Sequence, residues 1–190
     1  MFEVVQTRVD IWLDPWSQYE GKGYQPAQAM FAFANGGTAG TGLGLGNPSK
    51  IPAASTDYVF AAIGEEMGLI GATAVIIAFL LLLGAGLRVA VRADRPFEKL
   101  LATGLTTIIS MQAFIIIGGV LRLVPLTGIT LPFVSYGGSS LLANYILLAL
   151  LLRISDSGAR RRGETPDELT ISERMEARRL RRAERKAARA

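Results

Sequence analysis

The sequence predicts an all-α polytopic membrane protein, and three observations support this fold class. Half of the 190 residues are hydrophobic, and the mean hydropathy is +0.34. Three stretches carry no charged side chain, namely residues 67–87, 100–121 and 123–152. Each is at least as long as the roughly 20 residues that a helix needs to cross a bilayer core. Lys and Arg lie mainly between and after these stretches, which is typical of membrane helices joined by short loops.

Within this fold class we expect three membrane-spanning helices, at about residues 64–90, 100–121 and 139–153. The third uncharged stretch is too long for one plain helix and contains four helix-breaking residues, Pro125, Pro132, Gly137 and Gly138. We therefore expect a re-entrant loop before the third helix, because irregular backbone at membrane depth needs shelter from lipid. A helix over 139–153 would measure only about 22 Å, so part of this loop should lie within the membrane thickness.

Two further segments are expected to flank the membrane region, which we place at residues 58–155. Residues 1–57 should form an extracytoplasmic loop with a short interfacial helix near 26–34, and residues 156–190 should form a cytoplasmic basic tail. The first segment contains aromatic residues that suit a belt at the membrane interface. They are Trp12, Trp16, Tyr19 and Tyr24.

The positions of the basic residues predict how the spans are oriented. One group lies between the first two spans and another follows the third: Arg88, Arg92, Arg95 and Lys99, then Arg153, Arg160, Arg161 and Arg162. Because Lys and Arg favour the cytoplasmic side, we expect both groups in the cytoplasm and the N-terminal part outside. Asp57, Glu65 and Glu66 would then lie at the outer end of the first span. Carboxylates near hydrocarbon normally face a cavity, although Glu65 and Glu66 could also be solvated by headgroup water.

The composition narrows the possible chemistry. The chain contains no Cys and no His, which excludes disulfides, thiolate nucleophiles and imidazole ligands or bases. Any acid or base chemistry must therefore use carboxylates, Lys or Tyr.

Two loops are candidate binding segments. Six glycines between Gly36 and Gly46 provide a backbone that can approach a ligand closely, just before Lys50 and Asp57. The run lacks the ending of a phosphate-binding P-loop, and no βαβ pattern surrounds it. Residues 125–142 carry no charge but many hydroxyl groups, which suits the binding of a polar substrate group. The alternative for the glycine run is a flexible surface loop, and the alternative for residues 125–142 is a connector on the membrane surface.

The C-terminal tail has the pattern of a solvated helix. Thr165 is a possible N-cap, Pro166 would follow at the first helical position, and the end of the tail is rich in Arg. We expect a partly disordered cytoplasmic helix that can contact anionic lipid. Nucleic-acid binding is the alternative for such a basic segment, and its place after a membrane span argues against it.

Four sequence motifs together resemble a known family. They are GTGLGLGNPSK, STDYVFAAIGEEMGLIG, PLTGITLPFVSYGGSSLLANY and LLLRIS, in this order. The combination closely resembles the C-terminal part, with the last three crossings, of the SEDS family of shape, elongation, division and sporulation proteins. The resemblance covers roughly residues 8–155 and is strongest to the RodA branch of actinobacteria. Ile116 stands where many division-type members carry Asn, and Ser55 stands where members often carry His.

The resemblance implies a peptidoglycan glycosyltransferase that polymerises lipid II on the outer face of the cytoplasmic membrane, in cell elongation or division. It also implies a class B penicillin-binding protein as partner. By motif, Asp57 matches the aspartate regarded as essential in the family, and a carboxylate can deprotonate the attacking sugar hydroxyl. An N-cap for the helix starting near Tyr58 is the alternative role of Asp57. A lipid-linked precursor flippase and a non-catalytic fragment or assembly subunit stay open as alternative functions.

The same resemblance suggests further site residues. A cation would stabilise the departing pyrophosphate, and Arg8, Lys50 and Arg122 are the external candidates, although each could be an interfacial snorkelling residue. The candidates for lining the substrate pocket are Gln112, Ser135, Tyr136, Gly137, Gly138, Ser139 and Ser140. Gln112 could equally form an interhelical hydrogen bond. A divalent cation, Mg²⁺ or Mn²⁺, held by Asp57 with Glu65 or Glu66 is a further option.

Overall fold

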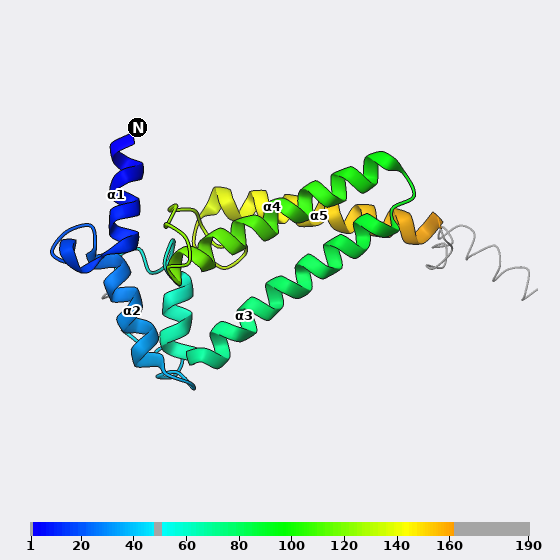
Figure 1. The fold of residues 1–190 in the computed structure, drawn as a ribbon. Helices are drawn as coiled ribbons and strands as arrows, with labels where there is room; N and C mark the ends of the chain where they lie inside the picture. Colours follow the sequence, from blue (N-terminus) through cyan, green and yellow to red (C-terminus); the bar gives the residue numbers. More distant parts are fainter. Residues whose placement is uncertain (1, 48–50, 162–190) are drawn as a thin grey trace, which may run out of the picture. The chain divides into compact units, whose positions relative to one another are not determined.

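The computed structural model describes residues 2–47 and 51–161, and this part of the chain is helical and contains no strand (Figure 1). The all-α prediction is therefore confirmed. The helical elements are α1 (Phe2–Leu13), the 3₁₀ turn η1 (Trp16–Gln18), α2 (Tyr24–Gly36), α3 (Val59–Arg92), α4 (Pro96–Val120) and α5 (Gly138–Arg161). Lys50 and the tail residues Thr165 and Pro166 lie outside the described residues.

Three of these helices, α3, α4 and α5, are long and apolar enough to cross a membrane. The expected number of spans among the described residues is thus confirmed, but the bounds of the helices differ from the expected ones. The largest difference is in α5, which has 24 residues and continues past Arg153, a length of about 36 Å. The uncharged part of α5, residues 138–152, still measures only about 22 Å, so the placement of the preceding loop within the membrane thickness stays a prediction. The division into outer, membrane and cytoplasmic parts stays a prediction.

The chain forms two compact units, residues 1–154 and 155–190. In the second unit the described residues are the last turns of α5. There the carboxylate of Asp156 and the guanidinium of Arg160 form an exposed ion pair at 3.0 Å, one helical turn apart. Such pairs extend a helix beyond its apolar part but add only about 0.3–0.5 kcal/mol.

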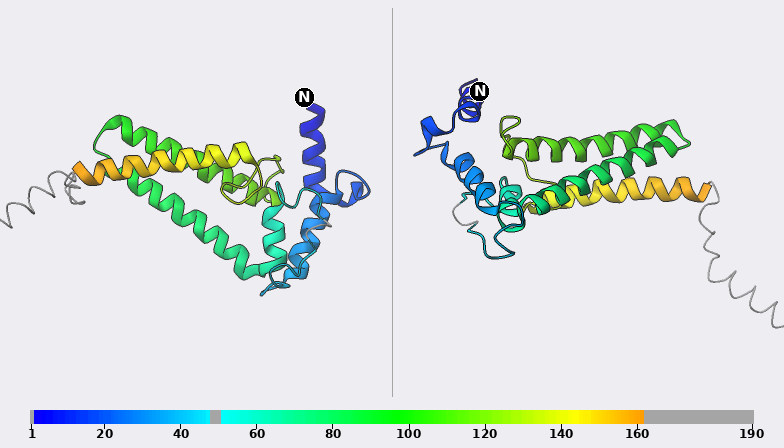
Figure 2. Two further views of the ribbon diagram at one scale, coloured as in Figure 1. Left: turned by 180° about the vertical axis from the view of Figure 1, so that it is seen from behind. Right: turned by 60° about the horizontal axis from the view of Figure 1, so that its bottom comes forward.

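Helices α3 and α4 form a close antiparallel hairpin in the first unit (Figure 2). Pro96 begins α4, a position where its missing N–H costs no hydrogen bond. Near this end of the hairpin, the Cβ that a side chain would add to Gly86 would lie 2.3 Å from Oγ1 of Thr106. Ala90, Ala102 and Leu151 pack together nearby and bring α5 into the same small core.

A second core joins the other end of the hairpin to α2, to the segment before α3 and to the loop before α5. Phe60 of α3 is fully buried beside Ala32 of α2, Ile116 of α4 and Leu131 of the loop before α5. Burying one large apolar side chain contributes about 1.5–3 kcal/mol. This core fixes the first turns of α3 against the end of α4.

Helix α3 is broken at Gly68, where the chain changes direction (Figure 1). Gly68 has φ +65° and ψ −163°, a backbone conformation that is essentially restricted to glycine. A break inside an apolar helix leaves backbone carbonyls and N–H groups without partners, and lipid cannot supply them. The partners must therefore come from elsewhere in the protein.

The glycine-rich loop supplies these partners. The N–H groups of Thr41 and Gly42 donate to the carbonyls of Glu65 and Glu66 at 2.9 and 3.0 Å. Beyond the break, the N–H groups of Leu69 and Ile70 donate to the carbonyls of Gly37 and Thr38 at 2.9 and 3.2 Å. The loop and the broken helix thus satisfy one another's backbone groups.

Glycine is required for this contact because the two backbones nearly touch. A Cβ on Gly40 would lie 2.1 Å from the carbonyl oxygen of Glu66, and one on Gly36 would lie 2.0 Å from that of Gly64. Close backbone approach was expected of this loop. Within the described residues, what it approaches is helix α3.

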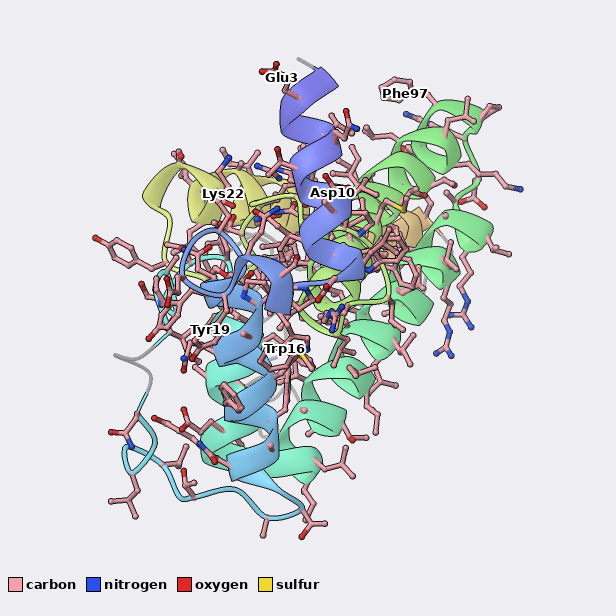
Figure 3. The ribbon with its side chains drawn as sticks, turned by 60° about the vertical axis from the view of Figure 1, so that its left-hand side comes forward. Glu3, Asp10, Trp16, Tyr19, Lys22 and Phe97 are labelled. Carbon is pink, nitrogen blue, oxygen red and sulfur yellow. The ribbon has the colours of Figure 1, made fainter. Side chains whose placement is uncertain are left out.

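The aromatic residues of the N-terminal segment separate into two groups. Trp16 and Tyr19 lie beside α2 (Figure 3), where Trp16 meets Phe31 and Tyr19 meets Tyr24 at ring-centroid distances of 5.9 and 5.7 Å. Both Trp16 and Phe31 are about half exposed, as an interfacial belt requires. Trp12 instead turns toward the end of α4.

The contact between Gly40 and α3 can be tested with a matched pair of substitutions. Gly40 and Gly44 both have positive φ, +84° and +74°, but a Cβ on Gly44 meets nothing within 4 Å. Gly40→Ala should therefore destabilise the protein by about 2 kcal/mol more than Gly44→Ala, a further drop of about 4–8 °C in melting temperature. Thermal unfolding in detergent measures the difference. Equal shifts for the two variants would contradict the proposed contact.

Candidate functional site

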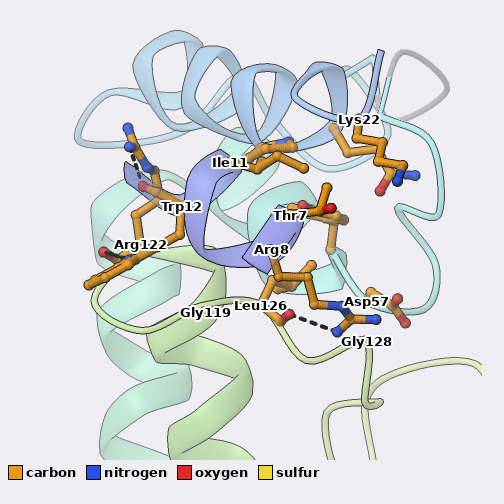
Figure 4. Close-up of a pocket in the computed structure, with 13 residues that line it drawn as sticks. Thr7, Arg8, Ile11, Trp12, Lys22, Asp57, Gly119, Arg122, Leu126 and Gly128 are labelled. Atoms are coloured by element: carbon orange, nitrogen blue, oxygen red, sulfur yellow. Dashed lines mark hydrogen bonds between the residues drawn. The ribbon is translucent and has the colours of Figure 1, made fainter. Parts of the chain in front are cut away.

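A cavity of about 320 Å³ lies between α1, the start of α2, the residues before α3 and the end of α4 (Figure 4). Its lining combines one carboxylate with three basic side chains and several apolar groups. The lining residues are Thr7, Arg8, Ile11, Trp12, Lys22, Gln25, Pro26, Asp57, Tyr58, Gly119, Arg122, Leu126 and Gly128.

Asp57 reaches this cavity from a series of tight turns before α3. The N–H groups of Thr56 and Tyr58 both donate to the carbonyl of Ala53, at 3.1 and 3.3 Å. Ile51 and Tyr58 are buried and hold the two ends of the segment. These contacts present the half-buried Asp57 side chain to the cavity rather than to the core.

Asp57 does not act as the N-cap of α3. The helix begins at Val59, its N-cap residue is Tyr58, and the cap makes no side-chain hydrogen bond. No hydrogen bond joins the Asp57 carboxylate to any residue in the described ranges.

Arg8 lies on the same side of the cavity as Asp57 (Figure 4). Its Nη1 donates to the carbonyl of Leu126 at 2.9 Å. A Cβ on Gly128 would lie 3.5 Å from Oδ2 of Asp57 and 3.8 Å from Nη2 of Arg8, so this position is in contact range of both groups. Gly128 also has φ +73°, which glycine adopts without steric cost.

Arg122 fastens α1 to the end of α4. Its Nη2 donates to the carbonyls of Trp12 and Leu13 at 2.6 and 3.2 Å, and the indole N–H of Trp12 donates to the Arg122 carbonyl at 2.8 Å. A cation at the C-terminus of a helix is also favoured by the helix dipole. Arg122 itself has φ +60°, an unusual conformation for a residue with a side chain.

Tyr58 adds a neutral hydroxyl to the cavity wall. Burial raises the pKa of Tyr58 far above its ordinary value, and the neighbouring negative charge of Asp57 raises it further. The phenol therefore stays protonated under physiological conditions.

The hydroxyl-rich loop does not line the cavity at the positions expected from the sequence. Ser135 is only 1% exposed, and Ser140 bonds to Thr130 at 2.6 Å between hydroxyl oxygens. Gln112 donates to the carbonyl of Thr130 at 2.8 Å. Tyr136 is 76% exposed, and Gly137, Gly138 and Ser139 are also absent from the cavity lining.

The three carboxylates considered as metal ligands are not brought together. Asp57 lines the cavity, whereas Glu65 and Glu66 lie beside Gly46 at the break in α3. Over the described ranges, no group of three Asp or Glu side chains could hold a metal ion. Asp57 is accompanied by Arg8, Lys22 and Arg122, and this donor set does not fit Mg²⁺ or Mn²⁺, which favour several oxygen ligands.

Several cavity residues were not anticipated from the sequence, because α1 was not expected to be a helix. Thr7, Ile11 and Trp12 line the cavity together with Arg8. The spacing of Arg8, Ile11 and Trp12, three and four residues apart, places them on one helical face. That spacing was the signal from which the site on α1 could have been found.

The three long apolar helices and the charged cavity at one end of α4 define a multi-pass membrane protein with a site built from loops and short helices. The chain belongs to the FtsW/RodA/SpoVE family, whose sequence model, described as a cell cycle protein, matches residues 1–160. This confirms the resemblance seen in the motifs.

Individual relatives agree with this assignment. The chain is 56% identical to the peptidoglycan glycosyltransferase RodA of Mycobacterium tuberculosis over 161 residues, 85% of this chain and 34% of that protein. It is 42% identical to a probable peptidoglycan glycosyltransferase FtsW of Geobacter metallireducens, covering 78% of this chain and 40% of the relative. The chain thus spans about a third of the length of its RodA relatives.

A solved structure supports the fold. One chain of a structure described as "Structural coordination of polymerization and crosslinking by a peptidoglycan synthase complex" matches with a TM-score of 0.67 and 30% identity. The match covers 80% of this chain and 41% of the solved one.

The attachment of α1 by Arg122 gives a testable outcome. Arg122→Met keeps much of the side-chain length but removes the donors to the carbonyls of Trp12 and Leu13, so α1 should open more often. Losing hydrogen bonds from a charged group should raise the opening equilibrium about tenfold or more. Chymotrypsin cleavage after Trp12 and Trp16 measures this opening. Arg88→Met, at an exposed position of α3, is the control, and equal cleavage rates would exclude the attachment.

Proposed function

We propose that this chain forms the base-bearing part of a peptidoglycan glycosyltransferase that polymerises lipid II in cell elongation or division. The observation that carries this proposal is the carboxylate of Asp57, which does not cap helix α3 and faces a cavity beside the Arg8 guanidinium. The likeness to proteins named peptidoglycan glycosyltransferase RodA supports it. Because the chain spans about a third of those relatives, activity, substrate and partner are proposed for a full-length protein that carries this segment.

In the proposed reaction Asp57 acts as the general base. Its carboxylate takes the proton from the attacking sugar hydroxyl, whose oxygen forms a bond to the anomeric carbon of the lipid-linked donor. The bond from that carbon to the pyrophosphate oxygen breaks, and the lipid pyrophosphate leaves with the electron pair. General base catalysis of this kind typically contributes 10²–10⁴-fold in rate.

The basic residues differ in how well they suit the leaving group. Arg8 and Lys22 are exposed at the cavity, so they can approach a pyrophosphate and stabilise its developing charge. Arg122 has its Nη2 bonded to the carbonyls of Trp12 and Leu13, which suits a supporting role better. Lys50 stays a candidate from the sequence alone.

The loop before α5 is proposed to contact substrate through its exposed members. Tyr136, Gly138 and Ser139 are accessible, and they are the positions at which a sugar or peptide group of a large substrate can reach this loop. Gly137, Ser140 and Gln112 are less exposed. Their proposed part in the pocket is to shape this segment.

We also propose an orientation and a partner. The Asp57 cavity would face outward, and the loop between α3 and α4 and the tail would face the cytoplasm, as the distribution of basic residues indicates. A class B penicillin-binding protein is the proposed partner. The description of the structural relative, which couples polymerization with crosslinking in one complex, supports this choice.

The role of Asp57 is tested in a chimera whose residues 1–161 replace the matching segment of a full-length RodA relative. Asp57→Asn should reduce glycan polymer formation from lipid II about 10²–10⁴-fold, because the amide cannot accept the proton. Asp10→Asn is the matched control, since Asp10 is exposed and does not line the cavity. Undiminished polymer, or lipid translocation in vesicles without any polymer, would reject the proposal and favour a flippase.

The orientation is tested by labelling single cysteines, which is simple because the chain has none. Thr127→Cys lies in the exposed loop after α4, and Phe97→Cys lies at the start of that helix, 73% exposed in the native residue. In intact cells a membrane-impermeant maleimide should label Cys at 127 at least about tenfold more than Cys at 97. The reverse pattern would place the Asp57 side in the cytoplasm and exclude the proposed reaction there.

A further inference from the structure

We propose that Ser135 is a positioning residue for Asp57, and that its hydroxyl does not contact substrate. This inference rests on the proposed function of Asp57. Ser135 belongs to the loop between α4 and α5, whereas Asp57 belongs to the turns before α3. The argument begins with the contacts that join these two segments.

The Ser135 hydroxyl is fully engaged inside the protein. Its Oγ donates to the carbonyl of Thr56 at 2.5 Å and accepts the N–H of Leu131 at 2.8 Å. Ser135 is 1% exposed, and its neighbour Leu131 is equally buried. A hydroxyl has one donor and can accept two bonds, so it has little left to offer a substrate, and burial keeps a substrate away.

The bond to Thr56 acts on the residue immediately before Asp57. A second bond, from the N–H of Tyr136 to the carbonyl of Ser55 at 2.8 Å, runs beside it. Together they hold residues 55 and 56 against residues 135 and 136. Among the described residues, the Ser135 hydroxyl is the side chain that donates a hydrogen bond from this loop to the Asp57 segment.

The same loop also positions the cation opposite Asp57. The carbonyl of Leu126 accepts a hydrogen bond from Arg8, and Gly128 of the same loop lies near both the guanidinium and the carboxylate. The loop therefore sets the carboxylate through Ser135 and the guanidinium through Leu126. A change at Ser135 should move one group of the pair without moving the other.

The loop can serve this purpose because its far end is held by the membrane helices. Gln112 of α4 bonds the carbonyl of Thr130, and the Thr130 hydroxyl bonds that of Ser140 in α5. Asn144, one turn further along α5, donates to the carbonyl of Ser140 at 2.9 Å. The helices thus anchor the loop, and Ser135 transmits its position to Asp57.

The test compares Ser135→Ala with Ser55→Ala in the chimera described above. Ser55 lies in the same junction, is exposed, and contributes only its backbone carbonyl, which alanine retains. Ser135→Ala should increase hydrogen exchange of the amides of residues 54–58 about tenfold, because the Thr56 carbonyl loses its partner. It should also lower kcat about 10- to 100-fold with KM within about twofold, as expected when a reacting group is misplaced. Ser55→Ala should change neither quantity.

Each alternative role gives a different result. A raised KM with unchanged kcat would overturn the inference and make Ser135 a substrate contact, and unchanged hydrogen exchange would overturn the positional link.

If Ser135→Ala fails to fold, Ser135→Cys provides the test, because a thiol occupies a similar volume but donates only weakly. It should show the same pattern to a smaller extent, and native-like exchange and kcat would overturn the inference. If the chimera with native Ser135 makes no polymer but Ser135→Ala still increases hydrogen exchange, the link between Ser135 and the Asp57 segment is supported and the proposed function is rejected.

Discussion

The exchange of backbone hydrogen bonds between the broken helix α3 and the loop over residues 37–42 is the contact on which the arrangement of the site depends. An apolar helix cannot end and restart without partners for its exposed carbonyl and N–H groups, because desolvating each such group costs several kcal/mol in lipid. Because those backbone groups have hydrogen-bond partners, the first turns of α3 can run in a different direction from the long part of the helix after Gly68. They then pack through Phe60 against the end of α4, which brings Asp57 beside the cavity.

Around this frame, several polar side chains hold the backbone in place. Arg122 holds α1, Ser135 holds the segment before α3, and Gln112 holds the loop between α4 and α5. Each of these bonds goes to a main-chain carbonyl. Irregular segments need such donors because their carbonyls have no regular partners. The charged side chains that line the cavity are Asp57, Arg8, Lys22 and Arg122, and of these Arg8 and Arg122 also donate to main-chain carbonyls.

The fold class and Asp57 as the leading candidate could be predicted from the sequence, because long uncharged stretches and a specific motif report on them directly. The hydrogen-bond partners of Ser135 and Gln112 could not. A hydroxyl or amide in an apolar segment has the same sequence pattern whether it binds a ligand or a carbonyl of the protein, and only the three-dimensional contacts distinguish the two cases. Helix α1 was not predicted from the sequence because Val and Thr are weak helix formers and its apolar face is short. Its attachment by Arg122 is a contact over more than a hundred residues, which no local pattern contains.

The break at Gly68 has a consequence for how the chain enters a bilayer. Residues 69–92 alone contain 24 positions without a carboxylate, enough for the insertion machinery to recognise as one segment. Glu65 and Glu66 precede the break, so they need not belong to the segment that stays in the hydrocarbon, where each acidic group at the centre would oppose insertion by about 2.5–3.5 kcal/mol. A single glycine thus divides one helix into a part suited to lipid and a part that can carry acids.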